Sequence, residues 1–205
     1  MAAVACALAV GGTVASGAAA RPAPAPVPVA QHVSVQPAAA PAAPLQDPQP
    51  LPADTPAAGV VPTRLLIPDI GVDAALPPLS LDENRVLLPP GDLDTAGWYT
   101  GSAVPGAVGP AILAGHVDDT ETAGVFARLH ELQPGASITV QLSDGTSRQY
   151  RMDRSEDVAK AEFPTEQVYG PTPNSQLRII TCNGPYDFDA MHYRNNLVVF
   201  AVPVE

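Results

Sequence analysis

A cysteine, a histidine and an arginine of this chain stand in settings where each could do chemistry. Cys182 follows the apolar run 177–181 and precedes an Asn-Gly pair that predicts a turn. His116 follows the apolar run 111–115, and Arg194 opens a third apolar run. A thiolate can attack a carbonyl, an imidazolium can protonate a leaving amine, and a guanidinium can stabilise an oxyanion. If the three side chains lie at strand ends and converge on one rim, they predict acyl transfer.

The cysteine content favours Cys182 as the nucleophile. The other cysteine, Cys6, lies in an N-terminal stretch of Ala, Val and Gly and has no evident reason to pair with it. Disulfides are common in exported proteins, whereas cytosolic proteins hold many inert buried thiols. In an exported chain, an unpaired cysteine is therefore a better candidate for catalysis than in a cytosolic one.

Short apolar runs separated by turns predict the elements that must position these residues. The expected strands are residues 64–68, 111–114, 137–142, 149–152, 177–181 and 196–202. Asp144-Gly145 predicts a tight hairpin turn, and short helices are expected at residues 124–132 and 163–169. A mainly β fold with about seven or eight strands and one or two short helices favours a single closed or nearly closed β-barrel over a layered α/β sheet.

The chain divides into three parts by composition. Residues 1–20 are apolar and uncharged and predict a signal peptide or membrane anchor; because no basic residue precedes them, we expect the natural start to lie upstream of Met1. The alternative is a disordered Ala-rich tail on a cytosolic protein. Residues 21–62 are rich in Pro and Ala and predict an extended linker that does not pack on the domain. Residues 63–205 are long enough for one hydrophobic core.

The charge balance argues against nucleic acid as a partner. The formal net charge is −11, and Lys160 is the single lysine of the chain. Binding to phosphate backbones requires stripes of basic residues, which this sequence lacks. An acidic surface of this kind instead keeps an exported domain soluble.

Three segments together resemble the sortases, the cell-surface cysteine transpeptidases of Gram-positive bacteria. The segments are Ala114-Gly115-His116, Thr181-Cys182-Asn183-Gly184, and His192-Tyr193-Arg194-Asn195-Asn196 before an apolar strand. The resemblance covers roughly residues 64–202 and is closest to the class F sortases of actinobacteria, with class E next. Many sortases carry Thr-Leu-x-Thr-Cys at the nucleophile, whereas Arg178 and Ile179 occupy the first two of these places here.

The resemblance implies a sortase-type β-barrel and a specific reaction. Sortases cleave a Leu-Pro-x-Thr-Gly (LPXTG) sorting signal between Thr and Gly, hold the acyl group as a thioester, and transfer it to an amine of a peptidoglycan precursor or a pilin. By this resemblance Cys182 is the nucleophile, His116 the general acid/base, and Arg194 the oxyanion or substrate-orienting group. Thr181 precedes the nucleophile, as in the family, and is a candidate substrate-binding residue. The resemblance implies no cofactor or metal, and we expect a monomer at the cell surface, anchored by its N-terminal segment or secreted.

Two other families of cysteine enzymes and a non-catalytic protein are alternatives to a sortase. An L,D-transpeptidase would show Ser-His-Gly-Cys at its nucleophile, which is absent here, and an NlpC/P60-type peptidase runs Cys before His, whereas here His116 precedes Cys182. A secreted β-barrel that binds a surface ligand without turnover remains the non-catalytic alternative. His192 is the second candidate for the acid if His116 is structural.

Overall fold

The computed structural model describes residues 55–83, 85–119 and 121–204. The predicted N-terminal segment, residues 1–20, and most of the predicted linker, residues 21–62, lie outside these ranges. Within the described residues the strands are β1 (Pro62–Ile67), β2 (Val72–Ala75), β3 (Pro78–Leu79), β4 (Ala96–Tyr99), β5 (Gly109–Gly115), β6 (Ser137–Leu142), β7 (Ser147–Ala159), β8 (Ser175–Asp187) and β9 (His192–Pro203). The helical elements are α1 (Thr165–Tyr169) and the 3-10 turns η1 (Pro68–Ile70), η2 (Leu129–Glu131) and η3 (Lys160–Glu162). No helix among these residues combines the length and apolar character needed to cross a bilayer.

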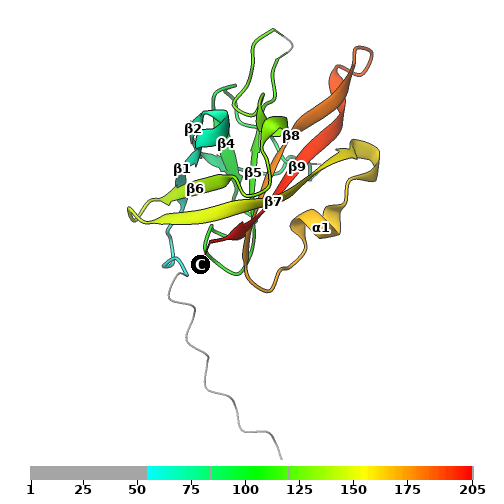
Figure 1. Ribbon diagram of the computed structural model, residues 1–205. Helices are drawn as coiled ribbons and strands as arrows, with labels where there is room; N and C mark the ends of the chain where they lie inside the picture. Colours follow the sequence, from blue (N-terminus) through cyan, green and yellow to red (C-terminus); the bar gives the residue numbers. More distant parts are fainter. Residues whose placement is uncertain (1–54, 84, 120, 205) are drawn as a thin grey trace, which may run out of the picture. The chain divides into compact units, whose positions relative to one another are not determined.

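All nine strands form one sheet in the order β2-β1-β6-β7-β9-β8-β5-β4-β3. The sheet curls on itself, with β7 crossing in front of the central strands in the view of Figure 1. Neighbouring strands are antiparallel except for two pairs, β3 with β4 and β5 with β8. The mainly β fold predicted from the sequence is confirmed, in the form of a curled half-barrel.

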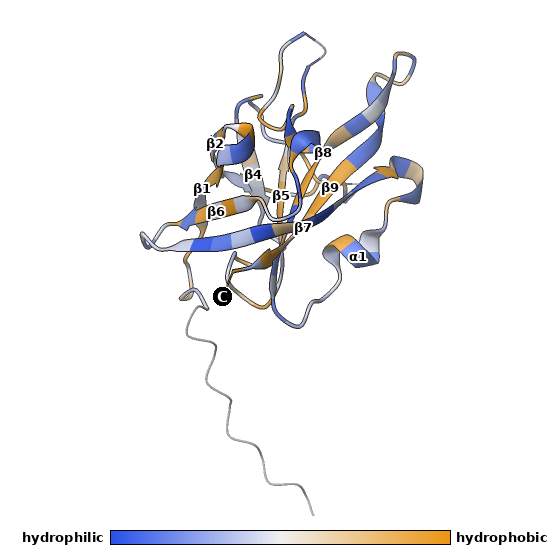
Figure 2. Cartoon of the chain, in the orientation of Figure 1, coloured by the Kyte–Doolittle hydropathy of each residue, from blue (hydrophilic) through white to orange (hydrophobic). Residues whose placement is uncertain are grey.

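The central strands are buried on both faces. The larger hydrophobic cluster fills the inside of the curl and draws residues from β1, β2 and β4 through β9, among them Leu65, Leu113 and Ile179. A smaller cluster lies on the opposite face of β5, β8 and β9 and consists of Ile112, Val168, Ile180, Val198 and Phe200. Figure 2 shows the resulting concentration of hydrophobic residues along the central strands. We call the face with the smaller cluster the outer face.

Helix α1 covers part of the outer face. Its one fully buried residue, Val168, packs into the outer-face cluster. This helix falls inside the predicted helix 163–169. The other predicted helix, 124–132, is mostly a series of turns and contains only η2, because the N–H groups of Val125 and Phe126 donate to the Leu93 and His116 carbonyls of neighbouring segments.

Strand β8 is longer than its sequence predicts, which corrects the expected position of Cys182. The sequence places Cys182 at a strand end, but β8 continues past it to Asp187. The Asn-Gly pair forms an irregularity in the ladder between Asn183 and Tyr186, with Gly184 at φ 77°, and not a chain-reversing turn. The ring of Tyr186 contacts that of Tyr193 on β9 at 5.1 Å between centroids, so a cross-strand aromatic pair supports the added length.

The last residues of the predicted linker contact the sheet, contrary to the expectation of an unpacked linker. Val60 packs against the inner cluster. The Val61 N–H donates to Ser143 Oγ at 3.1 Å, and the Ser143 N–H donates to the Val61 carbonyl at 2.8 Å. Ser143 lies in the turn between β6 and β7, so residues 60–61 tie this hairpin to the start of β1.

This contact predicts where the folded domain begins. A truncated protein that starts at Thr63 should lose about 1–3 kcal/mol of unfolding free energy relative to one that starts at Thr55, because two hydrogen bonds and the packing of Val60 are lost. Urea unfolding of both proteins measures the difference. Coincident unfolding curves would show that residues 55–62 add nothing to the domain.

Candidate active site

The parallel pair of β5 and β8 brings the predicted histidine and cysteine to the same edge of the sheet. In the register of this pair Ala114 lies opposite Ile180. His116 follows Ala114 by two residues, and Cys182 follows Ile180 by two residues. Side chains two residues apart along a strand share a face. His116 and Cys182 are therefore expected side by side on the outer face, 66 residues apart in sequence.

His116 is half-buried and held by a loop that precedes β4. Its Nε2 lies 2.9 Å from the carbonyl oxygen of the buried Pro90. A carbonyl can only accept, so Nε2 carries a proton in this arrangement and Nδ1 is the ring nitrogen left to exchange one. The chain after His116 folds back tightly, since a Cβ at Gly124 would lie 2.6 Å from the His116 carbonyl oxygen.

Thr181 faces the inside of the curl and not the outer face. Its side chain is 4% exposed, and its hydroxyl donates to the Gly115 carbonyl at 2.9 Å. This bond joins the residue before Cys182 to the residue before His116. This contact suits Thr181 to hold the two candidate groups in register, while a part of Thr181 in substrate binding stays a prediction.

Arg194 shares the outer face with Cys182 but is bound to a carboxylate. Cys182 lies opposite Asn196 in the ladder between β8 and β9, and Arg194 precedes Asn196 by two residues. Its Nε and Nη2 lie 3.2 and 3.1 Å from Asp187 Oδ2, with 64% of the side chain exposed. Backbone N–H donation from Ala190 and, less strongly, the charge of Arg194 lower the pKa of Asp187.

Sequence reasoning did not identify a second cation at the thiol. Lys160 Nζ lies 3.6 Å from Cys182 Sγ, within hydrogen-bonding distance of a sulfur atom. Both residues are half-buried. Because Lys160 lies 22 residues before Cys182 on a different strand end, no local pattern could connect them.

Tyr193 links the start of β9 to the loop after His116. Its hydroxyl donates to Asp118 Oδ2 at 2.6 Å. This hydrogen bond, together with burial and the negative charge of Asp118, raises the pKa of Tyr193 to about 12. Tyr193 therefore remains a protonated donor over the ordinary working range of pH. The sequence shows only its place beside Arg194.

A carboxylate on β7 links β7 to β8 and β9 beside Cys182. Asn183 Nδ2 donates to Asp157 Oδ2 at 3.0 Å, and Asn195 Nδ2 donates to Asp157 Oδ1 at 2.8 Å. Asn183 follows Cys182 directly and Asn195 follows Arg194 directly. The two amides thus fix the neighbours of two candidate residues to one carboxylate.

Arg178, which stands where many sortases have Thr, is buried beside the outer-face cluster. It is 4% exposed, and its guanidinium stacks on the Phe200 ring at 4.6 Å, with Arg154 over the same ring at 3.9 Å. Burial, with the nearby charge of Arg154, lowers the pKa of Arg178 to about 10. Its Nη2 donates to Gln176 Oε1, and among the described residues its Nε has no hydrogen-bond partner. Cation–π stacking accommodates this departure from the family pattern.

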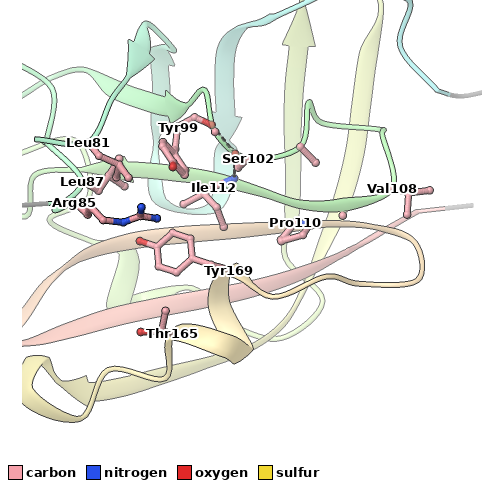
Figure 3. Close-up of a pocket in the computed structure, with 13 residues that line it drawn as sticks. Leu81, Arg85, Leu87, Tyr99, Ser102, Val108, Pro110, Ile112, Thr165 and Tyr169 are labelled. Carbon is pink, nitrogen blue, oxygen red and sulfur yellow. Dashed lines mark hydrogen bonds between the residues drawn. The ribbon is translucent and has the colours of Figure 1, made fainter.

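A pocket of about 730 Å³ opens on the outer face. Ile112 of β5 forms its floor, and Tyr169 and Thr165 of α1 line one wall (Figure 3). The other side chains that line it include Tyr99, Leu81, Leu87, Arg85, Ser102, Val108 and Pro110. Ser102 Oγ accepts from the Ile112 N–H at 3.0 Å and donates to the Tyr99 carbonyl at 2.6 Å, which joins floor and wall. The lining is mostly apolar, with a guanidinium at one side.

The pocket and the thiol lie on one line along the sheet. Ile112 is opposite Arg178 in the parallel ladder, and Cys182 lies four residues beyond Arg178 on the same face. At about 3.3 Å per residue, the pocket floor and the level of Cys182 are about 13 Å apart. An extended segment of four residues spans this distance.

Within the described residues, no group of three His, Cys, Asp or Glu side chains is arranged to hold a metal ion.

The position of Thr181 predicts that its substitution changes both the stability of the domain and the reactivity of Cys182. Thr181→Val should lower the unfolding free energy by about 1–2 kcal/mol, because the buried Gly115 carbonyl loses a donor. Thr181→Ser keeps the hydroxyl and should lose less, which makes it the matched control. Thermal unfolding measures stability, and alkylation of Cys182 by iodoacetamide measures the site. Equal stability of the Val variant and the parent would contradict a positioning role.

Several solved structures of sortases are similar to this fold. A sortase A from Corynebacterium diphtheriae is 26% identical, with a TM-score of 0.52, over 71% of this chain and 61% of that chain. Sortase C-1 from Actinomyces oris is 25% identical, with a TM-score of 0.53, over 70% of this chain and 73% of that chain. Sortase C1 from Streptococcus agalactiae is 22% identical, with a TM-score of 0.54, and shares the fold. The chain thus spans less than two thirds of the C. diphtheriae sortase A.

The sequence itself gives a more direct assignment. A search of curated proteins found no match. The family model described as the sortase domain matches residues 65–204, a range that contains His116, Cys182 and Arg194. Because this match takes in well over half of the sequence, the chain belongs to the sortase family.

Proposed function

We propose that this protein is a cell-surface cysteine transpeptidase that cleaves an LPXTG-like sorting signal between Thr and Gly. The acyl group is transferred through a Cys182 thioester to an amine of the cell wall or of a pilin. The observation that carries this proposal is the line of sites on the outer face, where an apolar pocket lies about four extended residues from the thiol.

The distance between the pocket and Cys182, and the mostly apolar lining of the pocket, suit such a signal. If the Leu of the signal enters the pocket against Ile112 and Tyr169, the Thr carbonyl, at the end of the four-residue segment Leu-Pro-x-Thr, reaches the level of Cys182. The Pro of the signal favours an extended chain at the preceding residue. A peptide bound in this way lies along β5 and α1, with its apolar end buried and its scissile bond at the thiol.

The first half of the reaction forms a thioester. The Cys182 thiolate attacks the Thr carbonyl carbon, and the resulting tetrahedral intermediate collapses as the C–N bond to Gly breaks. His116, held through Nε2 by the Pro90 carbonyl, supplies the proton to the departing Gly amine. In the second half an acceptor amine attacks the thioester, gives up a proton to the same imidazole, and releases the Cys182 sulfur as thiolate.

Arg194 is proposed to stabilise the oxyanion or orient the peptide. Its side chain is long and exposed, and it shares the face of Cys182 through the register of β8 and β9. In the structure its guanidinium contacts Asp187. A substrate carbonyl would therefore have to share or replace that carboxylate, which a guanidinium with several donors in one plane can accommodate.

The finer assignments rest on sequence resemblance. We propose a class F sortase, with class E as the second choice, from the motifs around His116, Cys182 and Arg194. We also propose an extracytoplasmic location, with residues 1–20 as anchor or export signal, residues 21–62 as linker and residues 63–205 as catalytic domain, and action as a monomer. The non-catalytic alternative is a binding module that uses the same pocket without turnover, and a second alternative is a cysteine-dependent cell-wall peptidase that hydrolyses without transfer.

The proposed nucleophile predicts a covalent adduct. Incubation of the protein with an LPXTG peptide should add the mass of the Leu-Pro-x-Thr fragment to Cys182, as detected by mass spectrometry of its peptides. A peptide with Asp in place of Leu should react more slowly, because the pocket is mostly apolar. Cys182→Ala should bind the peptide but form no adduct, and His116→Ala should lose turnover.

The outcomes separate the three candidate functions. Peptide binding without any adduct favours the binding module. An adduct that passes only to water, even with an amine such as triglycine present, favours the peptidase. Cleavage that persists in Cys182→Ala would overturn the proposed nucleophile.

The proposed role of Arg194 predicts a loss of rate without a loss of stability. Arg194→Lys should lower kcat/KM for the peptide by about 100- to 1,000-fold, the usual effect of losing one oxyanion donor. Asp187→Asn is the matched control, since it keeps the guanidinium and removes only its carboxylate partner, and it should retain activity. Near-parental activity of Arg194→Lys would contradict the role.

A further inference from the structure

The cation in contact with the thiol sulfur is a lysine. Lys160 Nζ lies 3.6 Å from Cys182 Sγ. It is the single lysine of a chain with a formal net charge of −11. One of the few basic side chains of this protein is thus a half-buried ammonium beside the one described thiol.

The contact requires the full length of the lysine side chain. Val158 of β7, Asn196 of β9 and Cys182 of β8 form one row across three strands. Because β9 lies between β7 and β8, the backbones of the outer two are about 10 Å apart. Lys160 follows Val158 by two residues, just past the end of β7, so its side chain lies on the same face and extends over β9 to the sulfur.

The other predicted catalytic groups are bound elsewhere in this conformation. The Arg194 guanidinium lies on Asp187 Oδ2, and the His116 Nε2 lies on the Pro90 carbonyl. The ammonium of Lys160 is thus the charged donor that the structure sets against the sulfur. A positive charge in contact with a thiol favours its ionised form, which is the nucleophile.

We propose that Lys160 is a catalytic residue that stabilises the Cys182 thiolate. The step is a proton loss from Sγ to solvent, after which the ammonium donates a hydrogen bond to the anionic sulfur. In the second half of the proposed reaction, the same ammonium favours departure of the sulfur as thiolate when the acceptor amine displaces it. The consequence for turnover rests on the proposed function, whereas the effect on thiolate formation does not.

The surroundings of the sulfur contain further ionisable groups, and none of them replaces Lys160. Tyr193 remains a neutral donor to Asp118 near neutral pH, since its pKa is raised to about 12 chiefly by that hydrogen bond. Asp157 is held by the amides of Asn183 and Asn195. The ionisable side chains on the elements around Cys182 include Lys160 from η3, His116 after β5, Asp118 in the following loop, Asp157 on β7, and Tyr193 and Arg194 on β9.

The test measures the reactivity of Cys182 without any peptide substrate. The full chain is alkylated with iodoacetamide over a range of pH, and the peptide that contains Cys182 is followed by mass spectrometry separately from that of Cys6. Lys160→Met and Lys160→Gln remove the charge, and Lys160→Arg keeps it. Arg151→Met is the matched control. It removes one positive charge from an exposed site on β7, about 25 Å along the strand from the row that contains Cys182.

The expected result is a shift along the pH axis. Lys160→Met and Lys160→Gln should alkylate about tenfold more slowly near neutral pH, the effect of losing one hydrogen bond to a charged group. At alkaline pH they should reach the parental rate or slightly exceed it, because a less stabilised thiolate is more nucleophilic. Lys160→Arg should retain most of the parental profile, and Arg151→Met all of it.

Two outcomes would overturn the proposal. In the first, the alkylation rates of both charge-removing variants follow the same pH dependence as that of the parent. The other is an equal slowing at every pH, which would indicate altered access to the sulfur. A shifted profile in a protein that forms no adduct with LPXTG peptide would uphold the role of Lys160 and refute the proposed substrate.

Discussion

The candidate site depends on the parallel ladder between β5 and β8. Parallel strands cannot be joined by a tight turn, so this pairing forces a long connection through β6, β7 and α1. In return, both strands run in the same direction, so His116, directly after the end of β5, lies level with Cys182, which is inside β8. The Thr181 hydroxyl on the Gly115 carbonyl fixes the two ends to each other from inside the curl. A slip of one residue in this register would turn Cys182 away from the outer face.

The long connection also supplies both the wall of the pocket and the cation at the thiol. η3 begins with Lys160, and α1 follows it with Tyr169 against the pocket. Val168 is buried in the outer-face cluster and Phe163 packs against it, so these two side chains hold the segment to the sheet. The binding wall and the electrostatic environment of Cys182 are therefore parts of one short stretch of chain, and a change in the position of that stretch would alter both.

Both cations and carboxylates surround the candidate nucleophile. The chain is strongly acidic, yet two cations, Lys160 and Arg194, lie on the face of Cys182. The carboxylates nearby are already engaged: Asp157 by two amides, Asp187 by backbone N–H groups and Arg194, and Asp118 by the Tyr193 hydroxyl. Hydrogen-bonded carboxylates of this kind position strands and loops around the thiol.

Local patterns in the sequence were enough to predict the longer strands and the chain order of the three candidate catalytic residues. The apolar runs that form β5, β6, β8 and β9 carry enough periodicity to be predicted, and the order His116, Cys182, Arg194 identified the family. Short strands such as β2 and β3 were missed because four or fewer residues show no period and form only by pairing with neighbours. The inward orientation of Thr181, the continuation of β8 past Cys182 and the contact between Lys160 and the sulfur are visible only in the folded chain. These facts depend on strand register and on side chains from distant segments, which local sequence patterns do not encode.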